Sequence, residues 1–319
     1  MTDLDATGEE PESARGHGPG SGTTRVVSSG PVRLHVEEFA AASTGMTTGE
    51  SAGDVPQQTP VLLMHGWPDS GRLWRHQIPV LVAAGFRVIV PDLRGFGRSD
   101  RPGAVEDYRL SRSVADMVEV LDACDATAAH VVAHDWGAAV AWQLAMFHPE
   151  RVRTLAALSV AHPRAPQSLR QAEMGWYQLF FQFEGIAEAT LAADDWALLR
   201  RLTRNRGDID RAVRDLSRPG ALTASLNWYR ANLAPRMPGP ARDLPPVTAP
   251  TLGVWSTGDH HLDGQSMERS GACVSGPWRH EVIAGASHWI PVDAPDRLNR
   301  LLLDWLPAPS TPAIAPPPA

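Results

Sequence analysis

The sequence predicts an α/β fold with a mostly parallel sheet and a helical insertion. Short apolar runs of strand length alternate with segments of helical periodicity from about residue 60 to Pro163. The alternation then stops until about Pro246, because this stretch is helical in pattern and contains no convincing strand. Strand–helix alternation indicates parallel strands with helices on both faces. A length of 319 residues corresponds to about two domains, and a helical insertion within a sheet domain accounts for that size.

The first part of the chain supplies most of the predicted sheet. Two strand-like runs, TRVVSS and VRLHVEEF, begin near Arg25 and precede a loop rich in Gly, Ser and Thr at 41–59. The apolar run PVLLMHG is typical of a strand buried on both faces. The next predicted elements are a helix over 72–84, the strand FRVIVPD, a helix over 110–122, the strand AAHVVAHD, a helix over 138–147 and the strand RTLAALSV.

The last part of the chain again shows strand patterns followed by a helix pattern. We predict the strands PTLGVWSTGD and RHEVIAGASH and a closing helix over 295–306. The expected organisation is therefore a core of 25–162 and 247–307 with a helical cap of 163–246. Residues 1–24, rich in Gly, Ser, Thr and Glu, and the Pro-rich residues 308–319 are predicted to be disordered tails.

The composition excludes several classes of function. The net charge is −7 and no basic run is present, so we expect no nucleic-acid partner. All 29 basic residues are arginines, which removes mechanisms that need a Schiff-base or P-loop lysine. Cys124 and Cys273 cannot form a disulfide framework, and no spacing of His and Cys predicts a metal site, even at His260 and His261. We expect a cytoplasmic protein with no membrane span, and nothing in the sequence predicts its oligomeric state.

The segment AHDWG follows the third apolar strand and has the form of a nucleophile elbow, with Asp135 in the nucleophile position. Ligands of open parallel sheets gather at the carboxyl ends of strands. The small residues Ala133, Gly137 and Ala138 permit a sharp turn that would hold Asp135 above the sheet. The alternative is that Asp135 only caps the following helix, for which Asp is also well suited.

Two further residues complete a catalytic order. Asp259 ends the strand TLGVWSTGD, and His288 lies in GASHW after the next strand. The order Asp135, Asp259, His288 is the nucleophile–acid–histidine order of the α/β-hydrolase triad. Asp263 is a weaker competitor for the acid position.

The combination of motifs closely resembles the epoxide hydrolases of the α/β-hydrolase superfamily. The segments that carry the resemblance are HGWPDS, PDLRGFGRSD, AHDWGAAVAW, FHPERVRTLAAL, WYQLFFQFEGIAEATL, SLNWYRANL, STGD and GASHW. They extend over nearly all of residues 60–305. The resemblance implies an α/β-hydrolase fold with an inserted helical cap domain. The departures are the loop at 41–59, two histidines after Asp259, and Ala138 at a usual glycine.

The resemblance also implies roles for residues outside the triad. Tyr177 and Tyr229 fall in WYQLFF and NWYR, where that family carries two acid tyrosines, although both could instead be aromatic core residues. The HGWP segment would form an oxyanion hole, with the backbone N–H groups of Trp67 and Trp136 as donors. The residues expected to line the substrate pocket are His65, Trp67, Pro68, Trp136, Phe181 and Trp289.

An aspartate nucleophile indicates the class of substrate. Attack by a serine on a saturated carbon would give an ether, whereas attack by the Asp135 carboxylate gives an ester that water can hydrolyse. The expected substrate is therefore an epoxide or an alkyl halide. An opened epoxide leaves as an alkoxide and needs a proton, which two phenols can supply, while His288 held by Asp259 activates water against the ester. The sequence thus predicts an epoxide hydrolase that makes a vicinal diol from an epoxide and water, without a cofactor or metal.

Other functions remain open. A haloalkane or haloacid dehalogenase would use the same three residues, but HGWP and the two tyrosines differ from the halide-binding residues of those families. A serine esterase is disfavoured because no Ser occupies the elbow. A non-catalytic ligand-binding homologue would be expected to lack a member of the triad, and none is missing.

Overall fold

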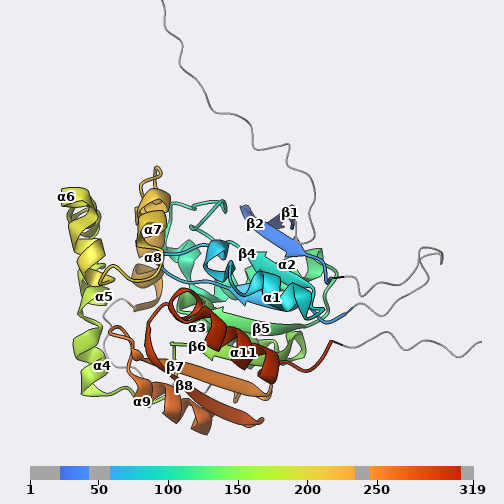
Figure 1. Cartoon of the computed structure of the whole chain (residues 1–319). Helices are drawn as coiled ribbons and strands as arrows, with labels where there is room; N and C mark the ends of the chain where they lie inside the picture. Colours follow the sequence, from blue (N-terminus) through green and yellow to red (C-terminus); the bar gives the residue numbers. More distant parts are fainter. Residues whose placement is uncertain (1–21, 43–57, 234–243, 310–319) are drawn as a thin grey trace, which may run out of the picture.

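The computed structural model describes residues 22–42, 58–233 and 244–309 (Figure 1). Its centre is an eight-stranded sheet in the order β1-β2-β4-β3-β5-β6-β7-β8. Strands β1 and β2 pair antiparallel with each other, and β2 pairs antiparallel with β4, whereas the pairs from β4 to β8 are all parallel. The predicted mostly parallel sheet is confirmed. The strands are β1 Thr23–Ser29, β2 Val32–Phe39, β3 Val61–Met64, β4 Val88–Pro91, β5 Ala129–His134, β6 Val152–Leu158, β7 Thr251–Gly258 and β8 Trp278–Ser287.

Helices cover both faces of the sheet, which explains the continuous apolar runs of its central strands. In β3, Leu62 and Met64 pack in a cluster with α2 (Leu110–Ala123) and α3 (Trp136–Phe147). Val61 and Leu63, which point the other way, pack with α1 (Ile78–Ala83) and α11 (Pro295–Trp305). Figure 1 shows α1 and α11 on the near side of the sheet.

One predicted helix is wrong in its extent. The segment predicted as a single helix over 72–84 is a short 3₁₀ turn at Gly71–Trp74 followed by α1 at Ile78–Ala83. Pro79 lies in the first turn of α1. Proline has no N–H and clashes with the preceding turn, so a helix can begin at this position but cannot run through it.

Five helices follow one another between β6 and β7, and no strand interrupts them among the described residues of this stretch. They gather beside one end of the sheet (Figure 1). Helix α8 is tied to the loops above the sheet, because Trp228 Nε1 donates to Arg94 O over 3.1 Å and Asn232 donates to Tyr108 O. The division into a core and a cap at 163 and 246 stays a prediction. These helices are α4 Leu169–Met174, α5 Trp176–Phe180, α6 Ile186–Leu202, α7 Ile209–Leu216 and α8 Ala221–Leu233.

The remaining elements lie near the end of the chain, where α9 (Gly264–Arg269) follows β7 and α10 (Ile290–Asp293) follows β8. The predicted disordered tails and most of the loop at 41–59 lie outside the described residues. No helix in the described ranges is both long and apolar enough to cross a bilayer.

Candidate active site

Asp135 occupies the sharp turn between β5 and α3. Its backbone has φ 52° and ψ −123°, a conformation that is rare for a residue other than glycine and that is found at strained functional sites. A Cβ on Gly137 would lie 2.5 Å from the carbonyl oxygens of Met64 and His65, so only glycine permits this close packing. The Asp135 side chain makes no capping hydrogen bond to α3. The alternative that Asp135 only caps the helix is therefore wrong.

The carboxylate of Asp135 faces two groups of the core. The N–H of Trp67 donates to Oδ1 over 2.8 Å, and Nε2 of His288 lies 3.5 Å from Oδ2. Trp136 is the first residue of α3, where a backbone N–H has no acceptor within the helix. Burial opposes ionisation of Asp135, but the hydrogen bond and charge of His288 outweigh it and lower the pKa of the carboxyl.

His288 and Asp259 form a buried pair at the ends of β8 and β7. Nδ1 of His288 lies 2.8 Å from Oδ2 of Asp259, whose other oxygen accepts the N–H groups of His261 and Leu262. Burial alone would favour the neutral imidazole. The charges of Asp259 and Asp135 prevail, however, and raise the pKa of His288 to about 10. The resting site is thus an imidazolium between two carboxylates.

Asp263, the competitor for the acid position, lies outside this arrangement. One of its oxygens caps α9 through the N–H of Gln265, and the other accepts the hydroxyl of Ser168. The structure therefore brings together Asp135, Asp259 and His288, whereas Asp263 forms neither a hydrogen bond nor an ion pair with His288 in the described part of the chain and borders the cavity described below.

Two groups that sequence reasoning missed support the His288 loop. His134 precedes Asp135, and its Nε2 lies 2.9 Å from the backbone oxygen of His288. Burial lowers the pKa of His134 to about 3, so the ring is neutral and its N–H donates. Asp69 accepts a hydrogen bond from Trp289 Nε1 over 3.0 Å, and burial raises the pKa of this carboxyl to about 7. The motifs AHDWG and HGWPDS contain both residues, but neither spacing indicates these contacts.

Tyr177 of α5 and Tyr229 of α8 face the same cavity as Asp135. The cavity has a volume of about 400 Å³, and all three residues border it. Both tyrosines are buried, with ring centroids 6.0 Å apart. Burial and the charge of Asp135 raise the pKa of each phenol, so both hydroxyls stay protonated at neutral pH. The two rings are packed among aromatic side chains and also line the cavity.

Most of the predicted pocket residues do not border this cavity. Among the six, all of which are described, Trp136 alone borders it. The ring nitrogens of His65 instead meet Gly66 O and Leu93 N–H, which fixes the turn that carries the cis peptide between Trp67 and Pro68.

Three of the other predicted pocket residues make contacts outside the large cavity. The ring centroids of Trp67 and Phe181 lie 5.3 Å apart. Trp289 donates a hydrogen bond to Asp69 and borders a second, smaller cavity. The large cavity is bordered instead by residues of α3, the loop after β6, α4, α5, α8 and α9. Its polar members include Gln143, His162, Gln167, Gln171, Gln178 and Asn232. The segments WYQLFF and SLNWYRANL mark parts of α5 and α8, but no motif marks the loop after β6, α4 or α9.

Among the described residues, no group of three or more His, Cys, Asp or Glu side chains is placed to hold a metal ion. The site consists of a paired carboxylate and imidazolium on the core side and two phenols on the helical side. It places a carboxylate nucleophile and two phenol proton donors at one cavity, and the ring of His288 lies 3.5 Å from that carboxylate.

The sequence pattern of the α/β hydrolase fold matches residues 59–295. Together with the eight-stranded sheet and the elbow, this match decides the family. The chain belongs to the α/β hydrolase family. Within it, the chain is 35% identical to epoxide hydrolase A of Mycobacterium tuberculosis, over 90% of this chain and 98% of that protein.

Other members of this hydrolase family are similar along most of their length. Epoxide hydrolase 3 of Xenopus tropicalis is 32% identical, over 77% of this chain and 71% of that protein. The crystal structure of epoxide hydrolase A from Mycobacterium thermoresistibile superposes with a TM-score of 0.71 and 30% identity, covering 91% of this chain and 99% of that one. The resemblance to epoxide hydrolases drawn from short segments is confirmed.

Proposed function

We propose that this protein is an epoxide hydrolase that converts an epoxide and water into a vicinal diol through an ester on Asp135. The observation that carries the proposal is the pairing of an ionised elbow aspartate with two protonated phenols across one cavity of about 400 Å³. The relatives named epoxide hydrolases support the same reaction.

In the first step, a carboxylate oxygen of Asp135 attacks a ring carbon of the epoxide. A carbon–oxygen ester bond forms, the ring carbon–oxygen bond breaks, and the ring oxygen takes a proton from Tyr177 or Tyr229. The raised pKa of both phenols keeps this proton in place until an alkoxide develops, because an alkoxide is the stronger base.

The second step follows from the electrostatics of His288. Esterification removes the negative charge of Asp135, which is one of the two charges that raise the pKa of His288. The pKa of the imidazole therefore falls, and the proton it releases replaces the one that the tyrosine has given away. Neutral His288, oriented by Asp259, then takes a proton from water as the water attacks the Asp135 carbonyl. The N–H groups of Trp67 and Trp136 stabilise the oxyanion, and collapse releases the diol.

A dehalogenase would use the same nucleophile and base, but a halide leaves as a stable anion and does not need a proton. The two buried phenols bordering the cavity favour the epoxide. A non-catalytic binding protein is disfavoured because the nucleophile, the base and its acid partner lie within hydrogen-bond or ion-pair distance.

A single turnover in water enriched in heavy oxygen tests the covalent mechanism. With enzyme in excess over a terminal or trans-disubstituted epoxide, we expect mostly unlabelled diol and label in the side chain of Asp135. Repeated turnovers should then give labelled diol. Labelled diol from the first turnover would replace the ester with direct attack by water, and halide release from a matched haloalkane without diol formation from epoxides would favour the dehalogenase.

A further inference from the structure

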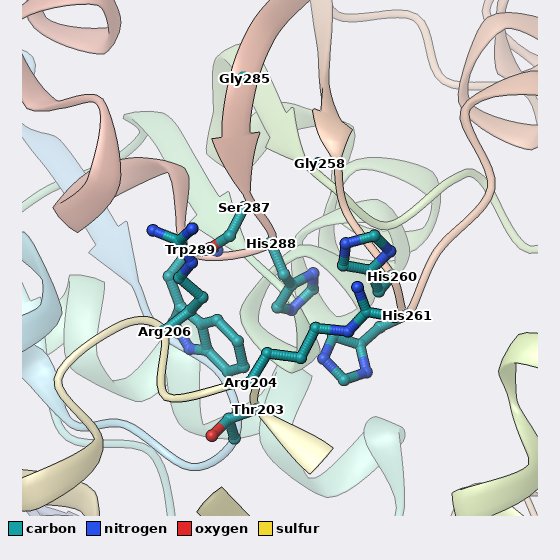
Figure 2. Close-up of a pocket in the computed structure, with 10 residues that line it drawn as sticks. All are labelled: Thr203, Arg204, Arg206, Gly258, His260, His261, Gly285, Ser287, His288 and Trp289. Carbon is teal, nitrogen blue, oxygen red and sulfur yellow. The ribbon is translucent and has the colours of Figure 1, made fainter. Parts of the chain in front are cut away.

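A second cavity of about 210 Å³ is bordered by His288 and its neighbours Ser287 and Trp289 (Figure 2). It is bordered by the carboxyl ends of β7 and β8 and by the turn that follows α6. It shares no bordering residue with the cavity that contains Asp135. The ring of His261 stands between the two, with its centroid 5.5 Å from Tyr177 and 5.3 Å from His288.

The side chains around this second cavity are basic. Arg204 and Arg206 border it together with His260, and no carboxylate among the described residues does. In the described part of the chain, the guanidinium groups of Arg204 and Arg206 have neither an ion-pair nor a hydrogen-bond partner, in contrast to Arg94 and Arg230, which are paired with buried or half-buried carboxylates. The charges of these two guanidinium groups therefore have no counter-ion among the described residues, whereas His288 is paired with Asp135 and Asp259.

Close packing fixes the backbone turn that carries the two exposed arginines. Arg204 and Gly207 both have positive φ, 54° and 67°, which reverses the chain after α6. A Cβ on Gly207 would lie 2.7 Å from the Trp289 ring, so the glycine lets the turn lie directly against the neighbour of His288. Figure 2 shows Arg204 extending across the cavity toward His260 and His261, with Arg206 on the Trp289 side.

The positive charge of Arg204 also acts on His260, which borders the same cavity. Burial and the positive charges of Arg204 and Arg170 lower the pKa of His260, against the opposing effect of Asp259. His260 is therefore a neutral hydrogen-bonding group at neutral pH rather than a third cation, which leaves the arginines to determine the charge of the cavity.

We propose that this second cavity is a binding site for a carboxylate or a comparable oxyanion. Two guanidinium groups with free donors match the geometry of such groups and bind them through charge-assisted hydrogen bonds. The anion has two possible sources, which are an acid group carried by an epoxide substrate past His261 and a free inorganic anion. The first source rests on the proposed epoxide hydrolase function, whereas binding of a free anion does not.

Titration calorimetry with inorganic phosphate tests the site without turnover. We expect saturable binding to the full chain, weakened at least about tenfold by Arg204→Met or Arg206→Met, because each variant removes a charge-assisted hydrogen-bond donor. Arg201→Met is the matched control, because Arg201 is exposed like Arg204 and Arg206 but lies near the end of α6 and does not border the cavity. Absent binding, or equal affinity in the wild type and the Arg204→Met/Arg206→Met double variant, would overturn the proposal.

Turnover of two epoxides identifies the source of the anion. The two epoxides are identical except that one ends in a carboxylate and the other in its methyl amide. If the substrate supplies the anion, kcat/KM favours the acid in the wild type, the preference disappears in the double variant, and phosphate competes with the acid. If a free anion is the ligand, phosphate binds as above and the preference between acid and amide is the same in both proteins. Failure of epoxide turnover would count against the proposed function and would leave the phosphate titration valid.

Discussion

The two sides of the active site are built by different forces. On the sheet side, Asp135, Asp259 and His288 lie at strand ends and hold one another by charge, with 2.8 Å between His288 Nδ1 and Asp259. On the helical side, Tyr177 and Tyr229 are packed among aromatic rings, such as the contact of Tyr229 and Phe181 at 4.9 Å. Charge suits the hydrolysis of an ester, whereas an apolar setting keeps phenols protonated for ring opening. We therefore expect substitutions on the two sides to stop different steps.

The largest effect is expected from His288→Gln. In the proposed mechanism the base is needed only for attack by water, so Asp135 should still be alkylated while hydrolysis of the ester stops. Mass spectrometry after addition of an epoxide should show substrate mass accumulating on the peptide that carries Asp135. His280→Gln, on β8 and bordering neither cavity, is the matched control and should turn over normally. An unmodified Asp135 peptide in a His288→Gln protein that still turns over would remove His288 from its role.

Substitutions on the helical side should instead slow formation of the ester and leave its hydrolysis intact. The Tyr177→Phe/Tyr229→Phe double variant should slow alkylation by about 10²- to 10⁴-fold, the usual contribution of general acid catalysis, and no ester should accumulate. Each single variant should lose less, because the partner phenol still binds the ring oxygen.

Tyr108→Phe is the matched control for these phenols, because the hydroxyl of Tyr108 donates to Pro102 O and the residue does not border the cavity. Rapid-quench measurement of ester formation distinguishes the cases. Alkylation at the wild-type rate in the folded double variant would return both tyrosines to a packing role and would revive the dehalogenase hypothesis.

The same contrast explains what could be predicted from the sequence. Strand-end residues such as Asp135 and Asp259 could be predicted, because a parallel sheet brings the carboxyl ends of its strands to one edge. The mostly parallel sheet followed from the alternation of strands and helices. Tyr177 and Tyr229 were expected from the resemblance, but most of the cavity wall could not be predicted, because it comes from one face each of several helices and one loop. His65 and Trp289 were expected in the pocket on motif membership, yet their side chains are used to fix the turns behind it.

His134, which no motif marked as functional, provides a second test of the sheet side. Its N–H donates to the backbone oxygen of His288, so His134→Phe should loosen the His288 loop while leaving the Tyr177 and Tyr229 side intact. Loss of one such hydrogen bond costs about 1 kcal/mol of free energy. We therefore expect hydrolysis of the ester to slow by about five- to tenfold. Ester formation should be unchanged. Stopped-flow measurement of both steps checks this split, and an equal loss in both would mean that His134 has a general structural role.

The smallest effect on activity is expected at Asp69, where the consequence is for stability. The pKa of this carboxyl is about 7 in the folded protein, against the ordinary aspartate value of 3.8 expected for the unfolded chain, so the folded state binds more protons between these values. The free energy of unfolding should therefore fall as pH rises from about 4 to 7, by up to roughly 4 kcal/mol, because one pKa unit corresponds to about 1.4 kcal/mol. Asp69→Asn keeps an oxygen to accept from Trp289 Nε1 and removes the buried charge. Denaturant unfolding should show the variant to be more stable than the wild type at pH 8 and equal to it at pH 4. If the stability difference between the Asp69→Asn variant and the wild type does not change with pH, Asp69 is ionised in the folded protein at every pH tested.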